Sequence, residues 1–327
     1  MADTLIDGTV VENRGALFEV LVDGHVVRCL LRGRLKKGKR RIAATPVAVG
    51  DRVRIAMLER GRGVIEEVLP RATGLSRTAA GSRPLMQTLV ANVDQAVIVF
   101  AAAEPRPDLF MLDRFIVAAI ASELEPVVCI NKSDLPIAQR ERPRYGGDPP
   151  ETDRARDLVD GELLRAQFAV YRQWFRVLFT SAALGEGIDG LKEALKDRRS
   201  VICGPSGVGK SSLLNAVAPG LRLRVGDVSD VTHKGRHTTT AITLLELPFG
   251  GWVADTAGLR QFGLWEVTPE QVADGFPDLA PCLGRCKYSN CSHRDEAGCA
   301  VRAAADAGEL DGRRMRSYRQ LAGEKTA

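Results

Sequence analysis

Long apolar segments are missing from this sequence of 327 residues. Hydrophobic residues make up 45% of it and charged residues 27%, which is ordinary for a soluble globular protein. No apolar run approaches the roughly 20 residues that a membrane-spanning helix needs. The first ten residues also lack the basic start and apolar centre of a secretory signal peptide. We therefore expect a cytoplasmic protein of two or three domains that has no contact with a membrane.

Aromatic side chains are scarce, at 5% of the sequence, and residues 1–77 contain only Phe18. The same segment carries 15 Lys and Arg against 9 Asp and Glu, whereas the other residues are nearly balanced, at 31 against 32. Positive charge without aromatic rings favours contacts with nucleic-acid phosphates over stacking on bases, so we expect binding that weakens strongly with salt. The candidate RNA-binding residues are Arg32, Arg34, Lys36, Lys37, Lys39, Arg40 and Arg41.

Cysteine is rare outside residues 282–299. The rest of the chain contains only Cys29, Cys129 and Cys203. Each of the three stands alone in apolar or strand-like surroundings. In a cytoplasmic protein this predicts buried free thiols rather than disulfides.

The other cysteines crowd together with one histidine. The pattern Cys286-x4-Cys291-x-His293-x5-Cys299 offers three thiols and one imidazole, which matches a closed tetrahedral zinc site. Four ligands leave no position for water, so the predicted Zn²⁺ is structural. Cys282 is a fifth candidate, which we interpret as a free thiol.

Short runs of alternating apolar and polar residues fill the first 70 positions and predict five strands. A basic loop is expected at 34–45 and a connector at 71–92. Five strands in this length favour an OB-fold barrel, with an SH3-like barrel as the alternative. The predicted strands are Gly8–Glu12, Ala16–Val22, His25–Leu31, Asp51–Ala56 and Gly63–Val68.

Strands and helices alternate after residue 92, which predicts a parallel sheet with helices on both faces. Helices are expected at 109–122, 156–173 and 188–196, and residues 138–155 read as a mobile surface insertion. The predicted strands begin near Gln95, Pro126, Arg176, Ser200, Thr243 and Trp252.

The resulting fold class is multi-domain. We predict an N-terminal OB-fold RNA-binding domain at 1–72 and a connector at 73–92. A central α/β GTPase domain follows at 93–265, and a mostly α-helical zinc-binding domain with a helical tail at 266–327. The tail segment Arg302–Gln320 is basic, and both an RNA contact and a solvated helix face remain open for it.

A phosphate-binding loop is predicted at 204–211, between a strand and a helix, where the sequence has the pattern G-x-x-x-x-G-K-[ST]. Its glycines let backbone N–H groups point at phosphate oxygens, and the helix N-terminus adds a favourable dipole. Lys210 would reach the β- and γ-phosphates, and Ser211 would place its hydroxyl on Mg²⁺. The predicted GTP contacts are Gly204, Pro205, Ser206, Gly207, Val208, Gly209, Lys210, Ser211 and Ser212.

A guanine-specificity motif, N-K-x-D, ends an earlier strand. The carboxylate of Asp134 can accept from the two donors of the guanine edge, which adenine lacks. Asn131 and Lys132 would brace the loop and cover the base. Ser181 and Ala182 would support the base through backbone N–H groups.

Two switch segments are predicted around the γ-phosphate. Asp255 and Gly258 belong to a D-x-x-G motif that would approach Mg²⁺ and the γ-phosphate. Thr239, with Thr238 as its near rival, would coordinate Mg²⁺ from residues 226–240.

The D-x-x-G motif does not by itself identify the group that orients the attacking water. Leu259 stands where many GTPases have a glutamine, and it cannot polarise water. His237 is the candidate catalytic residue, because a neutral imidazole can orient or deprotonate water. A role in packing the switch, or catalysis by Gln261 or Arg236, stays open.

The motif order is rearranged, because N-K-x-D precedes the phosphate loop. This indicates a circular permutation, which is tolerated when the original termini lie close together. The permuted order, a small N-terminal barrel, G-R-H-T-T-T, D-T-A-G and the C-x4-C-x-H-x5-C cluster together resemble RsgA, the bacterial family of ribosome small subunit-dependent GTPases. The likeness covers nearly the whole chain, with Ala257 at a position that is proline in many members.

The resemblance implies binding of the 30S subunit and its 16S rRNA through the barrel, weak GTP hydrolysis that the subunit stimulates, and a role in late 30S maturation. It also implies GTP or GDP with Mg²⁺, one structural Zn²⁺, and the roles given above for His237 and Thr239. We expect a monomer. The alternative functions are a nucleotide-gated RNA-binding module with incidental hydrolysis, and a GTPase that acts on another RNA assembly.

Overall fold

The computed structural model describes residues 5–38, 46–58, 61–78, 86–135, 161–220, 242–255 and 267–323. The predicted insertion at 138–155 lies outside these residues. Within the described part of the chain, no helix combines the length and the apolar character that crossing a bilayer requires.

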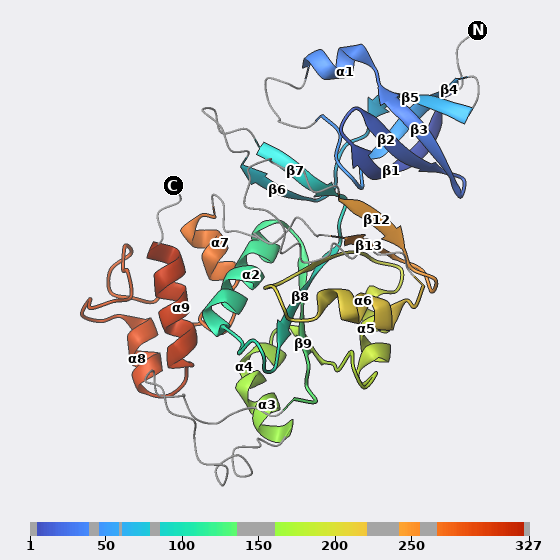
Figure 1. Cartoon of the computed structure of the whole chain (residues 1–327). Helices are drawn as coiled ribbons and strands as arrows, with labels where there is room; N and C mark the ends of the chain where they lie inside the picture. Colours follow the sequence, from blue (N-terminus) through green and yellow to red (C-terminus); the bar gives the residue numbers. More distant parts are fainter. Residues whose placement is uncertain are drawn as a thin grey trace, which may run out of the picture.

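The N-terminal strands form a closed barrel (Figure 1). They follow one another in the order β1-β2-β3-β5-β4, and β4 returns to pair with β1. The β3–β5 pair is parallel and the other pairs are antiparallel. This arrangement confirms the predicted OB-fold. The strands are β1 (Ile6–Arg14), β2 (Leu17–Val22), β3 (His25–Leu31), β4 (Arg52–Leu58) and β5 (Arg62–Val68).

Alternation along these strands explains the barrel core. On β3 every second side chain from Val27 on is buried, and the side chains that the five strands contribute to the barrel core are Val, Ile, Leu, Phe and Cys. Cys29 is one of them, as predicted, and burial raises the pKa of its thiol to about 11.

One expectation for this region was wrong, and another missed two strands. The predicted basic loop at 34–45 begins instead as a short helix, α1 (Gly33–Gly38), because its Arg, Leu and Lys residues are good helix formers. The predicted connector contains a hairpin of β6 (Gly74–Thr78) and β7 (Met86–Ala91). Its mixed polar and apolar residues follow no clear period, so the alternation criterion missed both strands.

The central sheet has the order β10-β9-β8-β11-β13-β12. The first five strands are parallel, as predicted, and β12 runs antiparallel to β13 at the edge. Every residue of β8 is buried, which suits a central strand covered on both faces. The strands are β8 (Gln95–Ala101), β9 (Glu125–Asn131), β10 (Arg176–Phe179), β11 (Arg199–Cys203), β12 (Thr243–Glu246) and β13 (Trp252–Asp255).

Helices cover both faces of this sheet. One face packs against α2 (Leu109–Ala121), α3 (Gly161–Gln167) and α4 (Ala169–Arg172), and the other against α5 (Ile188–Leu195) and α6 (Lys210–Val217). The single helix expected at 156–173 is thus two short helices that meet at the buried residue Phe168.

The C-terminal domain packs on the outer side of α2 (Figure 1). Its helices are α7 (Pro269–Asp274), α8 (Ala300–Asp306) and α9 (Gly312–Gly323). Phe276, Tyr318 and Leu321 form its small core together with Val117 of α2. Helix α2 therefore lies between the sheet and the C-terminal domain.

Candidate nucleotide site and metal centre

The carboxyl ends of the parallel strands bring the rearranged motifs to one edge of the sheet, where open α/β sheets bind ligands. Strand β9 ends in the N-K-x-D loop, and β10 leads into the turn at 180–182. Strand β11 leads into the phosphate loop, and β13 ends at Asp255. Motifs that are far apart in the chain thus share one site, despite the permuted order.

The phosphate loop has the curled backbone that its glycines predict. Gly204, Gly207 and Gly209 have φ angles of 138°, 80° and 90°, which side-chain-bearing residues rarely adopt. A Cβ atom on Gly204 would lie 2.1 Å from the carbonyl oxygen of Val99. Helix α6 then starts at Lys210, and no side chain caps its N-terminus.

Lys210 lies within this curl. Its Nζ donates to the carbonyl oxygens of Gly204 at 2.9 Å and Pro205 at 2.6 Å. Ser206, Ser211 and Ser212 are exposed beside it, and Val208 is buried beneath. The loop therefore combines one cation, a glycine-rich backbone and exposed serine hydroxyls, which suits a phosphate chain with its metal ion.

Asn131 joins the motifs directly. It is 1% exposed, and its Nδ2 donates to the carbonyl oxygen of Val208 in the phosphate loop at 2.8 Å. Its Oδ1 accepts from Ala182 N at 3.2 Å and from Thr180 Oγ1 at 3.3 Å. One amide side chain thus fixes the phosphate loop and the 180–182 turn against the end of β9.

The two other members of N-K-x-D have different surroundings: Lys132 is half-buried, and Asp134 is exposed. Lys132 has a φ of 58°, and its Nζ donates to the carbonyl oxygen of Glu104. This contact with the loop between β8 and α2 could not be predicted from sequence, because a backbone carbonyl leaves no residue signature. Asp134 is exposed, so its carboxylate is accessible to a ligand.

The turn at 180–182 is held by hydrogen bonds within the protein. Ser181 is fully buried, its N–H donates to Glu186 O at 2.9 Å, and its Oγ accepts from Leu184 N at 3.1 Å. Both predicted base-supporting N–H groups, those of Ser181 and Ala182, therefore bond within the protein in this structure.

Several predicted residues lie outside the described part of the chain. These are His237, Thr239 and its rival Thr238, Gly258 and the neighbouring Leu259 and Gln261. For Asp255 the structure describes only its position as the last residue of β13.

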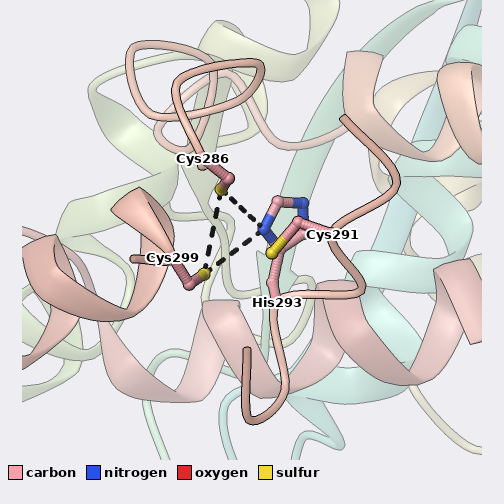
Figure 2. A group of neighbouring side chains, drawn as sticks. All are labelled: Cys286, Cys291, His293 and Cys299. Atoms are coloured by element: carbon pink, nitrogen blue, oxygen red, sulfur yellow. Dashed lines mark hydrogen bonds between the residues drawn. The ribbon is translucent and has the colours of Figure 1, made fainter. Parts of the chain in front are cut away.

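The predicted ligands Cys286, Cys291, His293 and Cys299 do come together (Figure 2). Their donor atoms all lie within 4.8 Å of one another. Cys286 Sγ lies 3.4 Å from His293 Nδ1 and 3.9 Å from Cys299 Sγ, and Cys299 Sγ lies 3.5 Å from His293 Nδ1. A tetrahedron with metal–sulfur bonds of about 2.3 Å has edges of about 3.8 Å, so this group can hold a metal ion.

Local structure favours the metal-binding form of His293 and Cys286, whereas burial raises the pKa of the Cys291 thiol to about 11. Burial lowers the pKa of His293, which favours the neutral imidazole that binds metals. Burial also opposes ionisation of Cys286, but the N–H groups of Ala300 and Val301 at the start of α8 and the neighbouring thiols outweigh it, so the pKa of Cys286 is lowered. Cys282 is a free thiol outside the group, as predicted.

Neither interpretation of the basic tail fits two of its residues. Arg314 and Tyr318 are only 1% and 7% exposed, so they are not on a solvated or RNA-binding face. Arg314 Nη1 instead donates to Asp113 Oδ1 of α2 at 2.6 Å, and its Nη2 donates to Asp278 Oδ1 at 2.6 Å. Periodicity alone could not distinguish this buried arginine from surface ones.

The candidate RNA-binding residues are only partly described. Arg32 and Arg34 are exposed, and both form ion pairs with Glu66, at 3.0 and 3.3 Å. Lys36 and Lys37 lie on α1, whereas Lys39, Arg40 and Arg41 lie outside the described residues.

Comparison with known proteins agrees with this architecture. The model of the RsgA N-terminal domain matches residues 7–65, and that of the RsgA GTPase matches residues 68–145 and 155–265. The small ribosomal subunit biogenesis GTPase RsgA of Moorella thermoacetica is 43% identical over 314 residues, which covers 96% of this chain and 95% of that protein. The RsgA of Gemmatimonas aurantiaca is 41% identical and covers 98% of both chains.

Solved structures agree as well. YjeQ from Thermotoga maritima superimposes with a TM-score of 0.72 at 33% identity, covering 98% of this chain and all of that one. YloQ, described as a circularly permuted GTPase, gives a TM-score of 0.67 at 28% identity and covers 98% of this chain and 94% of that one. Together, the permuted site, the barrel and these matches show that the chain belongs to the RsgA GTPase family.

Proposed function

We propose that this protein binds GTP at the carboxyl edge of its central sheet and hydrolyses it to GDP and phosphate during late maturation of the small ribosomal subunit. The observation that carries the proposal is the Asn131 side chain, which bonds to both the phosphate loop and the 180–182 turn. This side chain holds the two motifs, which stand in reversed order in the chain, against each other at one edge of the sheet. The relatives above are named as GTPases of small-subunit biogenesis.

The residues divide the work of binding. The exposed carboxylate of Asp134 would select guanine, and Lys132 would hold the base loop against Glu104. Lys210 and the N–H groups of the phosphate loop would bind the β- and γ-phosphates. Catalysis of phosphoryl transfer by this site consists mainly of positioning and charge stabilisation.

Mg²⁺ fits this site. Ser211 is exposed in the first turn of α6, next to Lys210, where its hydroxyl can act as a ligand. We propose Thr239 and Asp255 as the groups that complete the site. The chemistry that bound Mg²⁺ supplies is neutralisation of charge on the β- and γ-phosphates.

His237 is the proposed water-orienting residue. Leu259 occupies the position of the usual glutamine, so a side chain from elsewhere has to position the water. We propose Zn²⁺ for the Cys3His centre, because three thiolates and an imidazole suit this metal and leave no open coordination position. The role of this Zn²⁺ would be to keep the C-terminal domain folded.

The barrel is the proposed rRNA-binding domain. Its contacts would come from Arg32 and Arg34 and from the basic residues that follow on and after α1. Such phosphate contacts predict affinity for 16S rRNA that falls steeply with salt. We further propose that the protein is a cytoplasmic monomer with the domain bounds given above.

A nucleotide-gated RNA-binding module is the second candidate, and Leu259 favours it, because slow intrinsic turnover would make hydrolysis incidental. Measuring GTP turnover with and without 30S subunits separates the two. Strong stimulation that His237→Ala abolishes supports the enzyme. Turnover that 30S subunits leave unchanged supports the module.

A further inference from the structure

A cluster of buried charges joins α2 of the GTPase domain to α9 of the C-terminal domain. Asp113 on α2 is 0% exposed, and Arg314 on α9 is 1% exposed. Arg314 Nη1 donates to Asp113 Oδ1 at 2.6 Å, and Arg313 Nη1 donates to Asp113 Oδ2 at 3.1 Å. Both carboxylate oxygens are thus held by one helix of the C-terminal domain through charge-assisted bonds, which are short and strong.

The cluster continues on both sides. Tyr171 of α4 donates its hydroxyl to Asp113 Oδ1 at 2.6 Å, and its ring lies 5.2 Å from the guanidinium carbon of Arg314. On the other side, Arg314 donates to Asp278 Oδ1 at 2.6 Å and to Gly275 O at 3.1 Å. Arg314 therefore has two carboxylate partners, one in each domain. A buried ion pair of this kind is strongly sensitive to the loss of either member.

Helix α2 leads back to the nucleotide site. It begins where the segment 102–108 ends, and Asp108 caps it by accepting from Met111 N at 3.0 Å. The same segment contacts the N-K-x-D loop and lies beside the phosphate loop. Glu104 O accepts from Lys132 Nζ, and Pro105 Cδ lies 3.8 Å from the position of a Cβ atom on Gly207. The position of α2 thus sets the position of a segment that supports N-K-x-D and the phosphate loop.

We propose that Arg314 is a positioning residue of the nucleotide site. By holding Asp113, it fixes α2 and, through it, segment 102–108 against Lys132 and the phosphate loop. The C-terminal domain thereby slows the release of bound nucleotide, although none of its described residues forms part of the nucleotide loops. This inference rests on the proposed GTP-binding function.

The matched pair Asp113→Asn and Asp278→Asn tests it. Both changes keep the shape of the side chain and remove one carboxylate from Arg314, but only Asp113 belongs to α2. The measurement is the dissociation rate of a fluorescent GDP analogue from the full-length, metal-loaded protein. We expect Asp113→Asn to accelerate release about two- to thirtyfold, and Asp278→Asn to change it by less than about twofold.

Hydrogen exchange provides the second readout. Amides of segment 102–112 should exchange faster in Asp113→Asn, while those of the barrel stay as in the wild type. If Asp113→Asn does not fold, Arg314→Lys replaces it, because an ammonium keeps the charge but lacks the planar fork whose two nitrogens bond to Asp113 and Asp278. Its release rate should then lie above that of the wild type.

Equal release rates for Asp113→Asn and the wild type would overturn the inference, as would equal acceleration by both members of the pair. A wild-type protein that holds no GDP analogue would overturn the proposed function instead, so the two failures are distinct.

Discussion

The GTPase domain is joined to its two neighbours by different kinds of contact. Towards the barrel the junction combines backbone pairing with side-chain contacts, among them the Asp51–Arg71 ion pair and the packing of Val11 and Val49 on the core of the sheet. Strand β1 pairs with β12 at Glu12 and Thr243, and Ala91 N donates to Val49 O at 2.8 Å. Towards the C-terminal domain the junction is made by side chains, namely the buried ion cluster around Asp113 and the apolar contact of Val117 with the C-terminal core.

The difference matters for nucleotide-dependent change. Backbone pairing depends little on individual side chains, whereas a buried ion cluster requires every member. Strand β12 follows the predicted first switch, at 226–240, so the barrel is attached next to one switch. The C-terminal domain follows the predicted second switch and also holds α2. Each junction thus connects a neighbouring domain to a different part of the nucleotide site. Variants that change one junction at a time test whether the two junctions act separately.

The largest effect is expected from the metal centre. Metal binding contributes about 10 kcal/mol or more to small structural sites. Removing the metal with a chelator, or changing Cys286→Ser, should therefore unfold the C-terminal domain and leave the barrel folded. Hydrogen exchange of α8 and α9, compared with β1–β5, measures this. If the amides of α8 and α9 stay protected after complete metal removal, the C-terminal domain does not need the metal to fold.

The next largest effect is expected for Arg314→Met. The change leaves Asp113 and Asp278 buried with fewer cationic partners, which costs about 3–5 kcal/mol. The free energy of unfolding from urea titration should fall by this amount. Arg316→Met on the exposed face of α9 is the control and should change it little. A similar loss in both variants would mean that general helix destabilisation, not the ion cluster, is measured.

A smaller effect is expected at the barrel junction. Asp51 is 0% exposed and accepts from Arg71 Nε at 2.6 Å, Arg71 Nη2 at 2.8 Å and Ala48 N at 2.7 Å. Asp51→Asn removes the charge but keeps the shape, so we expect a loss of about 1–3 kcal/mol. Because backbone pairing remains, GDP release should stay unchanged. Faster release in this variant would contradict the division between the two junctions.

The smallest effect is expected from Glu66→Gln on the barrel surface. Glu66 pairs with the exposed Arg32 and Arg34, so stability should change by no more than about 1 kcal/mol. Both arginines would lose their ionic partner, although Arg34 keeps its bond to the carbonyl oxygen of residue 66, so affinity for 16S rRNA should rise at low salt. Filter binding across a salt series measures this. Glu67→Gln, which affects the neighbouring Arg54 pair, is the control.

Much of the nucleotide site followed from sequence, because its chemistry depends on local motifs. The glycines of the phosphate loop, Asn131 and the Cys3His group lie where their spacing predicted. The reversed motif order caused no error, because parallel strands bring their carboxyl ends together whatever their order in the chain.

Contacts between distant segments did not follow from sequence. Arg314 belongs to a basic helix, and nothing local shows that it is buried against Asp113, which is 201 residues away. The support of Lys132 by Glu104 O is equally hidden, because any residue has a carbonyl oxygen. The hairpin β6–β7 was missed because its side chains alternate poorly, although its backbone pairs well.

The central claim is that the rearranged motifs form one pocket that selects guanine. Calorimetric titration of the protein with GDP and with ADP tests it most directly, with Asp134→Asn as the matched variant. We expect tight binding of GDP, no detectable binding of ADP, and a large loss of GDP affinity in the variant. Equal affinity for both nucleotides, or binding of neither, would contradict the account.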